Sequence, residues 1–271
     1  MIKKLVSFVC CLLPIGAGAV VVSPESGQNS ISTEQASWTE AIGAGSSITI
    51  NSAAVNGISS ANGFSIANNM YVGMPTDQGS INGDLYVLNS VQNPFTVVST
   101  GDISIGAILQ VLDGKTLGFK TSDTNPTAFD LTVGSGNVNE GIKIGSAEQN
   151  ATLNLENIDV LTVDGSVIAY GNFSASANSV NMGLVNANTG NMTVNATGDV
   201  AVGGLIANSD GTTNITAGGV LSSDGTIQNN AGTMNLVAGD DINVVGSVEN
   251  KSAGNVSIRG ADMTVSEMLT K

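Results

Sequence analysis

The chain has 271 residues, of which 41% are hydrophobic and only 4% aromatic, so any buried core is built mainly from Val, Ile, Leu and Ala. This composition is too apolar for a disordered chain, and the sequence lacks the Gly-X-Y period of collagen. The formal net charge of −14 argues against nucleic acid as a partner, because an acidic surface repels phosphates.

Residues 1–19 have the three parts of a secretory signal. Lys3 and Lys4 form a charged head, residues 5–15 are apolar, and Ala17 and Ala19 form an A-x-A processing site. We expect cleavage after Ala19. An uncleaved membrane anchor is the alternative, but the strongly apolar run is short for a spanning helix. The mature chain would then carry a charge of about −16 (6 basic minus 22 acidic residues).

Both cysteines of the chain, Cys10 and Cys11, lie in this signal. The mature protein would therefore have neither a thiol nor a disulfide. A secreted domain without disulfides depends on packing and hydrogen bonding alone for its stability.

An N-terminal segment over residues 20–46 contains the best helix candidate, residues 33–42. Ser32 or Thr33 can cap this helix, and glycines follow it. We expect the short helix to cover the open end of a repeat array, with Trp38 as the plug of that end.

Residues 47–271 show an internal repeat of 21–22 residues. Four glycines recur at this interval, each before a polar residue and a strand-like stretch: Gly190, Gly211, Gly232 and Gly254. Five apolar residues keep the same spacing: Phe173, Val194, Ile215, Leu236 and Ile258. The segments are rich in Val, Thr, Asn and Gly, which are poor helix formers, so each repeat is predicted to consist of strands.

Three apolar clusters recur within each repeat. The first contains Val97, Leu155, Val194, Ile215, Leu236 and Ile258. The second contains Ile103, Ile105, Leu161, Val163, Val200, Val202, Ile242, Val244, Met263 and Val265. The third contains Ile108, Val167, Ile206, Ile227 and Val248. Apolar and polar residues often alternate within a cluster, which places the apolar side chains on one face of a strand.

Three short strands per repeat predict an all-β fold, a right-handed parallel β-helix with three sides. Equivalent positions in successive coils would stack at ~4.8 Å and form continuous aliphatic columns. About eleven coils would give a rod near 50 Å long.

Asn208, Asn229 and Asn250 recur at 21-residue steps, just after the third cluster. Asn tolerates the left-handed backbone of a sharp corner, and stacked Asn amides can form a hydrogen-bonded ladder along the axis. We favour this structural role over a polar binding stripe, because the spacing follows the coil.

Two segments, residues 73–79 and 121–127, are predicted to bulge from the rod as loops, where binding specificity is most often found. The sequence stops at Lys271 apparently inside a coil. We expect either a fragment of a longer repeat protein, which we favour, or a last coil protected by a partner.

The export signal, the Trp38 segment and the 21–22-residue coils resemble secreted β-helical adhesins of Gram-negative bacteria. These are autotransporter passenger domains and filamentous-haemagglutinin-like exoproteins. The resemblance implies delivery to the cell surface, a translocator in the outer membrane, and attachment to a host or neighbouring cell, to matrix or to glycans. The tail lacks the aromatic-girdled strands of an outer-membrane barrel, and Asn93-Pro94-Phe95 only partly matches the signature of two-partner secretion domains.

A carbohydrate-active β-helix enzyme, similar to a pectate lyase, is the alternative. The chain has no His and a single Arg, Arg259, which removes His-dependent catalysis and His metal sites. Asp240 and Asp241 are the only adjacent acidic pair, and we interpret them as turn residues. No calcium or phosphate-loop motif is present, so the sequence predicts no catalytic, metal or cofactor site. Ice binding is a weaker alternative, since regular Thr-x-Thr ranks are lacking.

Overall fold

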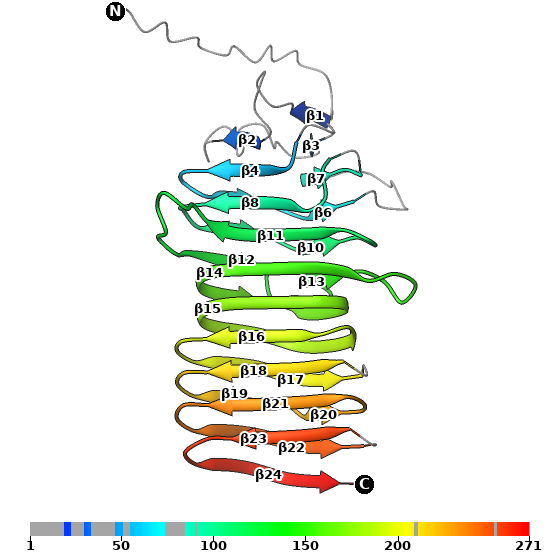
Figure 1. The fold of residues 1–271 in the computed structure, drawn as a ribbon, viewed down its shortest axis with the longest axis vertical. Coiled ribbons are helices and arrows are strands. Elements are labelled where there is room, and N and C mark those ends of the chain that lie inside the picture. The colour runs from blue at the N-terminus through cyan, green and yellow to red at the C-terminus, as the bar shows by residue number, and fades with distance from the viewer. Residues whose placement is uncertain are drawn as a thin grey trace, which may run out of the picture.

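The computed structural model describes residues 19–22, 30–33, 47–50, 55–73, 85–89, 91–208, 211–251 and 254–270. Within these ranges the chain is all-β, with 24 strands in one continuous sheet and no helix. Successive levels of strands stack along one long axis (Figure 1). The expectation of an all-β fold with parallel strands is confirmed. No helix in the described part is long and apolar enough to cross a membrane.

The pairing register divides the strands into three columns, and strands that bend round a corner belong to more than one. The first column contains β2 (Ser30–Thr33), β4 (Gly57–Ser60), β8 (Phe95–Ser99), β11 (Thr116–Thr121), β14 (Ala151–Val163), β15 (Ser166–Thr189), β16 (Met192–Ala196), β18 (Thr212–Ala217), β21 (Thr233–Ala238) and β23 (Asn255–Arg259). The second contains β5 (Phe64–Ile66), β9 (Ile103–Ile105), β12 (Phe129–Val133), β14, β15, β17 (Val200–Ala207), β19 (Leu221–Ser223), β22 (Ile242–Asn250) and β24 (Met263–Thr270). The third contains β1 (Ala19–Val22), β3 (Ser47–Ile50), β7 (Leu85–Val87), β6 (Met70–Val72), β10 (Ile108–Val111), β13 (Gly141–Ile144), β15, β17, β20 (Ile227–Asn229), β22 and β24.

The first column has ten levels among the described residues, which at ~4.8 Å per level extend about 43 Å. The sequence predicted about eleven coils. The third column departs from chain order, because β7 follows β6 in the sequence yet pairs between β3 and β6. The chain therefore steps back by one level before it continues toward β8.

The strands alternate between inward and outward side chains, as their sequences do. In β18 every second residue is buried, and Ile215 is 1% exposed. Ile215 pairs with Val194 on one side and with Leu236 on the other. Each partner is 21 residues away in the sequence. Leu236 pairs in turn with Ile258. Burying a side chain of this size stabilises the fold by ~1.5–3 kcal/mol, so each level depends on its neighbours.

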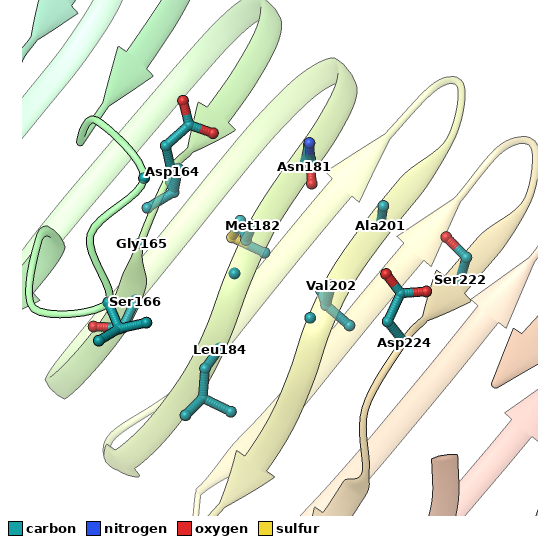
Figure 2. Close-up of a pocket in the computed structure, with 15 residues that line it drawn as sticks. Asp164, Gly165, Ser166, Asn181, Met182, Leu184, Ala201, Val202, Ser222 and Asp224 are labelled. Carbon is teal, nitrogen blue, oxygen red and sulfur yellow. The ribbon is translucent and has the colours of Figure 1, made fainter. Parts of the chain in front are cut away.

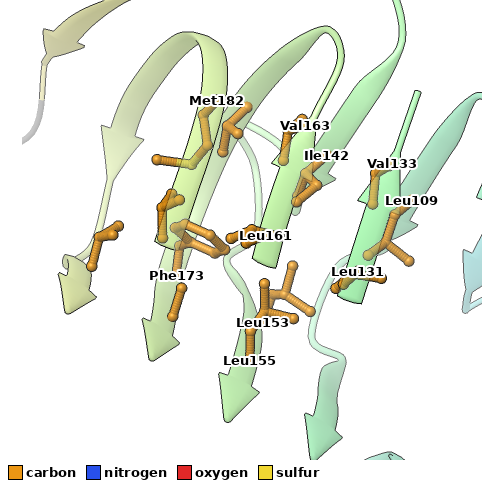
Figure 3. Packing of buried hydrophobic residues seen from close by; sticks show 14 of the residues in the cluster. Leu109, Leu131, Val133, Ile142, Leu153, Leu155, Leu161, Val163, Phe173 and Met182 are labelled. Atoms are coloured by element: carbon orange, nitrogen blue, oxygen red, sulfur yellow. The ribbon is translucent and has the colours of Figure 1, made fainter. Parts of the chain in front are cut away.

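The same stacking continues through the middle of the rod. Leu131 pairs with Leu161, and Val133 with Val163, in the second column (Figure 3). Leu153 pairs with Phe173 in the first column. All of these side chains are at most 2% exposed, so the aliphatic interior predicted from the apolar clusters runs through all three columns.

The register corrects three assignments made from spacing. Phe173 does not lie in the rank of Val194, because Ala175 pairs there and Phe173 pairs with Met192. Ile108 and Ile206 of the third cluster are only half-buried. Their neighbours Leu109 and Leu205 are fully buried instead. A shift of one residue exchanges the two faces of a strand, and spacing alone does not detect it.

The corners between columns are closed by side-chain oxygens that accept a backbone N–H from the next level. Before the second column, Asp102 Oδ1 accepts from Asp130 N at 3.0 Å, and Asp199 Oδ1 from Val220 N at 2.8 Å. Before the first column, Asn191 Oδ1 accepts from Thr212 N at 2.9 Å. Backbone groups that leave the sheet at a corner are thereby still paired, which explains the frequency of Asp and Asn between the clusters.

The capping helix expected over residues 33–42 is not found among the described residues, and its first residue lies in a strand. Thr33 is the last residue of β2, which pairs in parallel with β4, and the described residues contain no helix. Residues 34–46, with Trp38, lie outside the described residues.

The other end of the rod is formed by β23 and β24, which in the described part pair only with the preceding level (Figure 1). Met263, Met268 and Leu269 are 46%, 58% and 37% exposed there. Together with Val256 and Ile258 they line an open hollow of about 250 Å³ at the end of the core.

Candidate functional site

A groove of about 440 Å³ lies on the outside of the rod where the second column turns into the third (Figure 2). It crosses several levels, because its lining residues come from β14, β15, β17 and β19, from the corners after β14 and β19, and from the loop between β12 and β13. Ser222 and Asn181 border it on the outward face of the second column. We call this feature the corner groove.

The floor of the corner groove is backbone. Val163, Met182, Val202 and Ser223 form one inward rank, so the residues that follow them form the next rank on the outside: Asp164, Gly183, Gly203 and Asp224. A Cβ built on Gly183 would lie 1.8 Å from the oxygen of Gly165. Gly183 is thus required by the close approach of two corners, and the rank of Gly183 and Gly203 places no side chain between Asp164 and Asp224.

A short loop overhangs one end of this floor. Glu140 holds the loop together, since its Oε2 accepts from the backbone N (2.6 Å) and the hydroxyl (2.9 Å) of Ser135. Gly136 N donates to Asp164 O at 3.0 Å, and Ser166 N donates to Glu140 O at 2.9 Å, which fixes the loop to the next level. Val138 at the tip is 78% exposed and lines the groove.

The corner groove combines apolar contact with negative charge. Leu184, 45% exposed, projects along the groove in Figure 2, and Val138 adds a second apolar surface. Of the described residues that line the groove, only Asp164 and Asp224 are ionisable, and both are exposed. Among the described residues no hydrogen bond or ion pair involves either carboxylate, so both remain available.

The backbone positions that carry the two carboxylates are farther apart than the two carboxyl groups of a glycosidase. Asp164 and Asp224 occupy the same rank three levels apart, or about 14 Å at ~4.8 Å per level. Retaining and inverting glycosidases need their two carboxyl groups within ~5–10 Å. The corner groove therefore provides binding groups without this catalytic pair.

Asp240 and Asp241 lie at the corner between the first and second columns. Asp240 N donates to Gly219 O at 3.1 Å, and Asp241 O accepts from Leu221 N at 3.0 Å. Both backbones thus take part in the turn, as their interpretation as turn residues requires. The described residues include no group of three or more His, Cys, Asp or Glu side chains placed to hold a metal ion.

The Asn residues form two ladders rather than one. Asn229 pairs with Asn250, is fully buried, and its Nδ2 donates to Asn250 Oδ1 at 3.2 Å. Asn208 lies one residue outside this rank, because Ala207 pairs with Asn229. Asn208 instead accepts from Asn230 Nδ2, and its own Nδ2 donates to Asn188 Oδ1 at 3.0 Å. The sequence spacing predicted a step of 21 residues from Asn208 to Asn229, but the coil at that corner has 22 residues, as the pairing of Ala207 with Asn229 shows.

The processing residues fall at the edge of the described part. Ala19 is the first residue of β1, which pairs in parallel with β3. Ala17 and the rest of residues 1–18 lie outside the described residues, so the export signal stays a prediction.

One of the two predicted loops is described. Thr121 is the buried last residue of β11, and residues 122–127 form the loop after it, held by local contacts that include the ion pair of Lys120 with Asp123 at 3.2 Å. Of residues 73–79, only Gly73 is described, and the remainder lie outside the described residues.

Comparison of the chain with protein-family models, with curated proteins and with solved structures gave no match. The corner groove was not foreseen from the sequence. One signal of it is present in the sequence. Gly183 and Gly203 directly follow the second strand stretch of their coils, at the position that Asp164 and Asp224 occupy in two other coils.

Proposed function

We propose that this protein is a secreted or surface-exposed adhesin-like rod that mediates attachment to cells, matrix or glycans. The observation that carries the proposal is the inward rank of the first column, which extends without interruption through nine levels: Ile58, Val97, Phe119, Leu155, Ala175, Val194, Ile215, Leu236 and Ile258. Such a rod holds its outer faces and loops at fixed positions for repeated contact.

We infer that the coils wind as a right-handed parallel β-helix. Each coil returns the chain to the same column in parallel, and crossover connections between parallel strands are right-handed in the great majority of folds.

Delivery to the cell surface would begin with the signal of residues 1–19 and needs an outer-membrane translocator as a partner. Expression of the full chain in a Gram-negative host tests the first step. We expect the exported form to begin at Val20, as read by N-terminal sequencing. An export-defective product that retains residues 1–19 would contradict the signal.

Attachment is tested with beads coated with the purified chain and applied to epithelial cells, matrix proteins and immobilised glycans. We expect more retained beads than with an uncoated or albumin-coated control. Beads coated with Ile215→Asn, which places a polar group inside the rod, should lose attachment together with their β-sheet circular dichroism. Equal retention of coated and control beads on every surface would sink the adhesin proposal.

A carbohydrate-active enzyme remains the second hypothesis from the sequence, and the structure adds no observation in its favour. Incubation with acidic and neutral polysaccharides, followed by assays for new reducing ends and for unsaturated uronates, distinguishes the two. Turnover that survives repeated purification would replace the adhesin proposal.

A further inference from the structure

We propose that the corner groove binds a linear polyamine, an unbranched chain with two ammonium groups about 14 Å apart and an aliphatic segment between them. This site is independent of the proposed attachment function. It would give the rod a small-molecule ligand of defined length and charge.

The carboxylates define the charge of the ligand. Asp164 and Asp224 are exposed, bonded to no other described side chain, and accompanied by no Lys or Arg in the groove lining. The chain as a whole carries −14, so its field adds to their attraction for cations. An anionic or neutral ligand would leave both carboxylates unmatched.

The separation of the carboxylates defines the length of the ligand. A single metal ion needs ligands at ~2–2.6 Å and cannot bridge side chains based three levels apart. A ten-carbon diamine has eleven bonds of ~1.5 Å between its nitrogens, which project to about 14 Å when the chain is extended. A four-carbon diamine reaches less than half of this distance and can satisfy only one carboxylate.

The floor and the walls define the middle of the ligand. Gly183 and Gly203 place no side chain between the carboxylates, so a slender chain can lie directly on the backbone. Leu184 and Val138 offer exposed aliphatic surface beside it. Methylene groups lose water on contact with such surface, which stabilises the bound chain by ~25 cal/mol per Å² buried.

The proposal is tested by isothermal titration calorimetry of the full chain at low ionic strength, with 1,10-diaminodecane and 1,4-diaminobutane as probes. We expect the long diamine to bind at least fivefold more tightly. The double variant Asp164→Asn/Asp224→Asn should weaken binding of the long diamine by about tenfold, since each exposed ion pair contributes a factor of roughly two to five. The difference between the two diamines should then disappear.

The matched control is Glu148→Gln/Glu156→Gln. It removes the same two charges from exposed carboxylates outside the groove whose side chains make no hydrogen bond in the described part. We expect it to leave the affinity for the long diamine within twofold of the parent. A Gly203→Val variant places a side chain on the floor of the groove, and the backbone of Gly203 does not have a positive φ that a side chain would strain. We expect it to weaken binding of the long diamine but not of the short one.

Three results would overturn the proposal. Equal affinity for the two diamines would show that length is not recognised. Equal weakening by the control variant would assign binding to the overall charge. Tighter binding of a pentapeptide with lysine at both ends than of the long diamine would make the groove a site for basic peptides. Circular dichroism of each variant verifies that the sheet is intact.

Discussion

Single residues at the corners decide whether the backbone can leave one column and enter the next without losing hydrogen bonds. Asp199 is exposed, but its Oδ1 accepts from Val220 N at 2.8 Å, one level further along the rod. We expect Asp199→Ala to lower the free energy of unfolding by about 1 kcal/mol, because Val220 N then has no acceptor in the protein. Asp199→Asn keeps an acceptor oxygen and should cost less than half of that. Urea denaturation followed by circular dichroism measures both; equal losses would show that the charge of Asp199, rather than its acceptor, is what matters.

At the scale of one element, β18 shows how a strand is stabilised from both sides. Ile215 is buried between Val194 and Leu236, whereas the next residue, Thr216, points outward and is half-buried. We expect Ile215→Ala to cost ~2–5 kcal/mol, because the cavity disrupts packing with two levels at once. Thr216→Ala serves as the control and should change the stability by less than ~0.5 kcal/mol. A comparable loss at Thr216 in urea unfolding would place the core on the wrong face of the strand.

At the scale of the whole molecule, the level formed by β23 and β24 carries exposed apolar side chains, and within the described part its outer strand edge is unpaired. An exposed edge of this kind promotes association of chains. We expect the purified protein to self-associate with rising concentration, and Met268→Lys, which adds charge to this end, to weaken the association at least tenfold. Val138 is 78% exposed in the loop between β12 and β13, so Val138→Lys adds the same charge away from this end and should have no effect. Analytical ultracentrifugation separates these outcomes, and a monomeric parent at every concentration would contradict the expectation.

The sequence by itself determined the strand content, the repeat length and most of the core. Apolar residues that alternate in clusters 21–22 residues apart need a partner face, and only stacking of successive coils provides one. The rank of Val194, Ile215, Leu236 and Ile258 could therefore be predicted from spacing alone, and the register pairs these residues directly.

Tertiary structure decided the positions where the coil length varies. Phe173 and Asn208 each lie off the expected rank, because the steps there are 19 or 22 residues and the pairing register, rather than a constant period, fixes which residues meet. The corner groove belongs to the same class of feature. Asp164 and Asp224 are 60 positions apart in the chain, and they flank one groove only because two successive corners, each with a glycine at this position, stack between them. A periodic sequence determines the pattern of one coil. The coils differ in length by a few residues, and these differences determine which surface groups lie above one another along the rod.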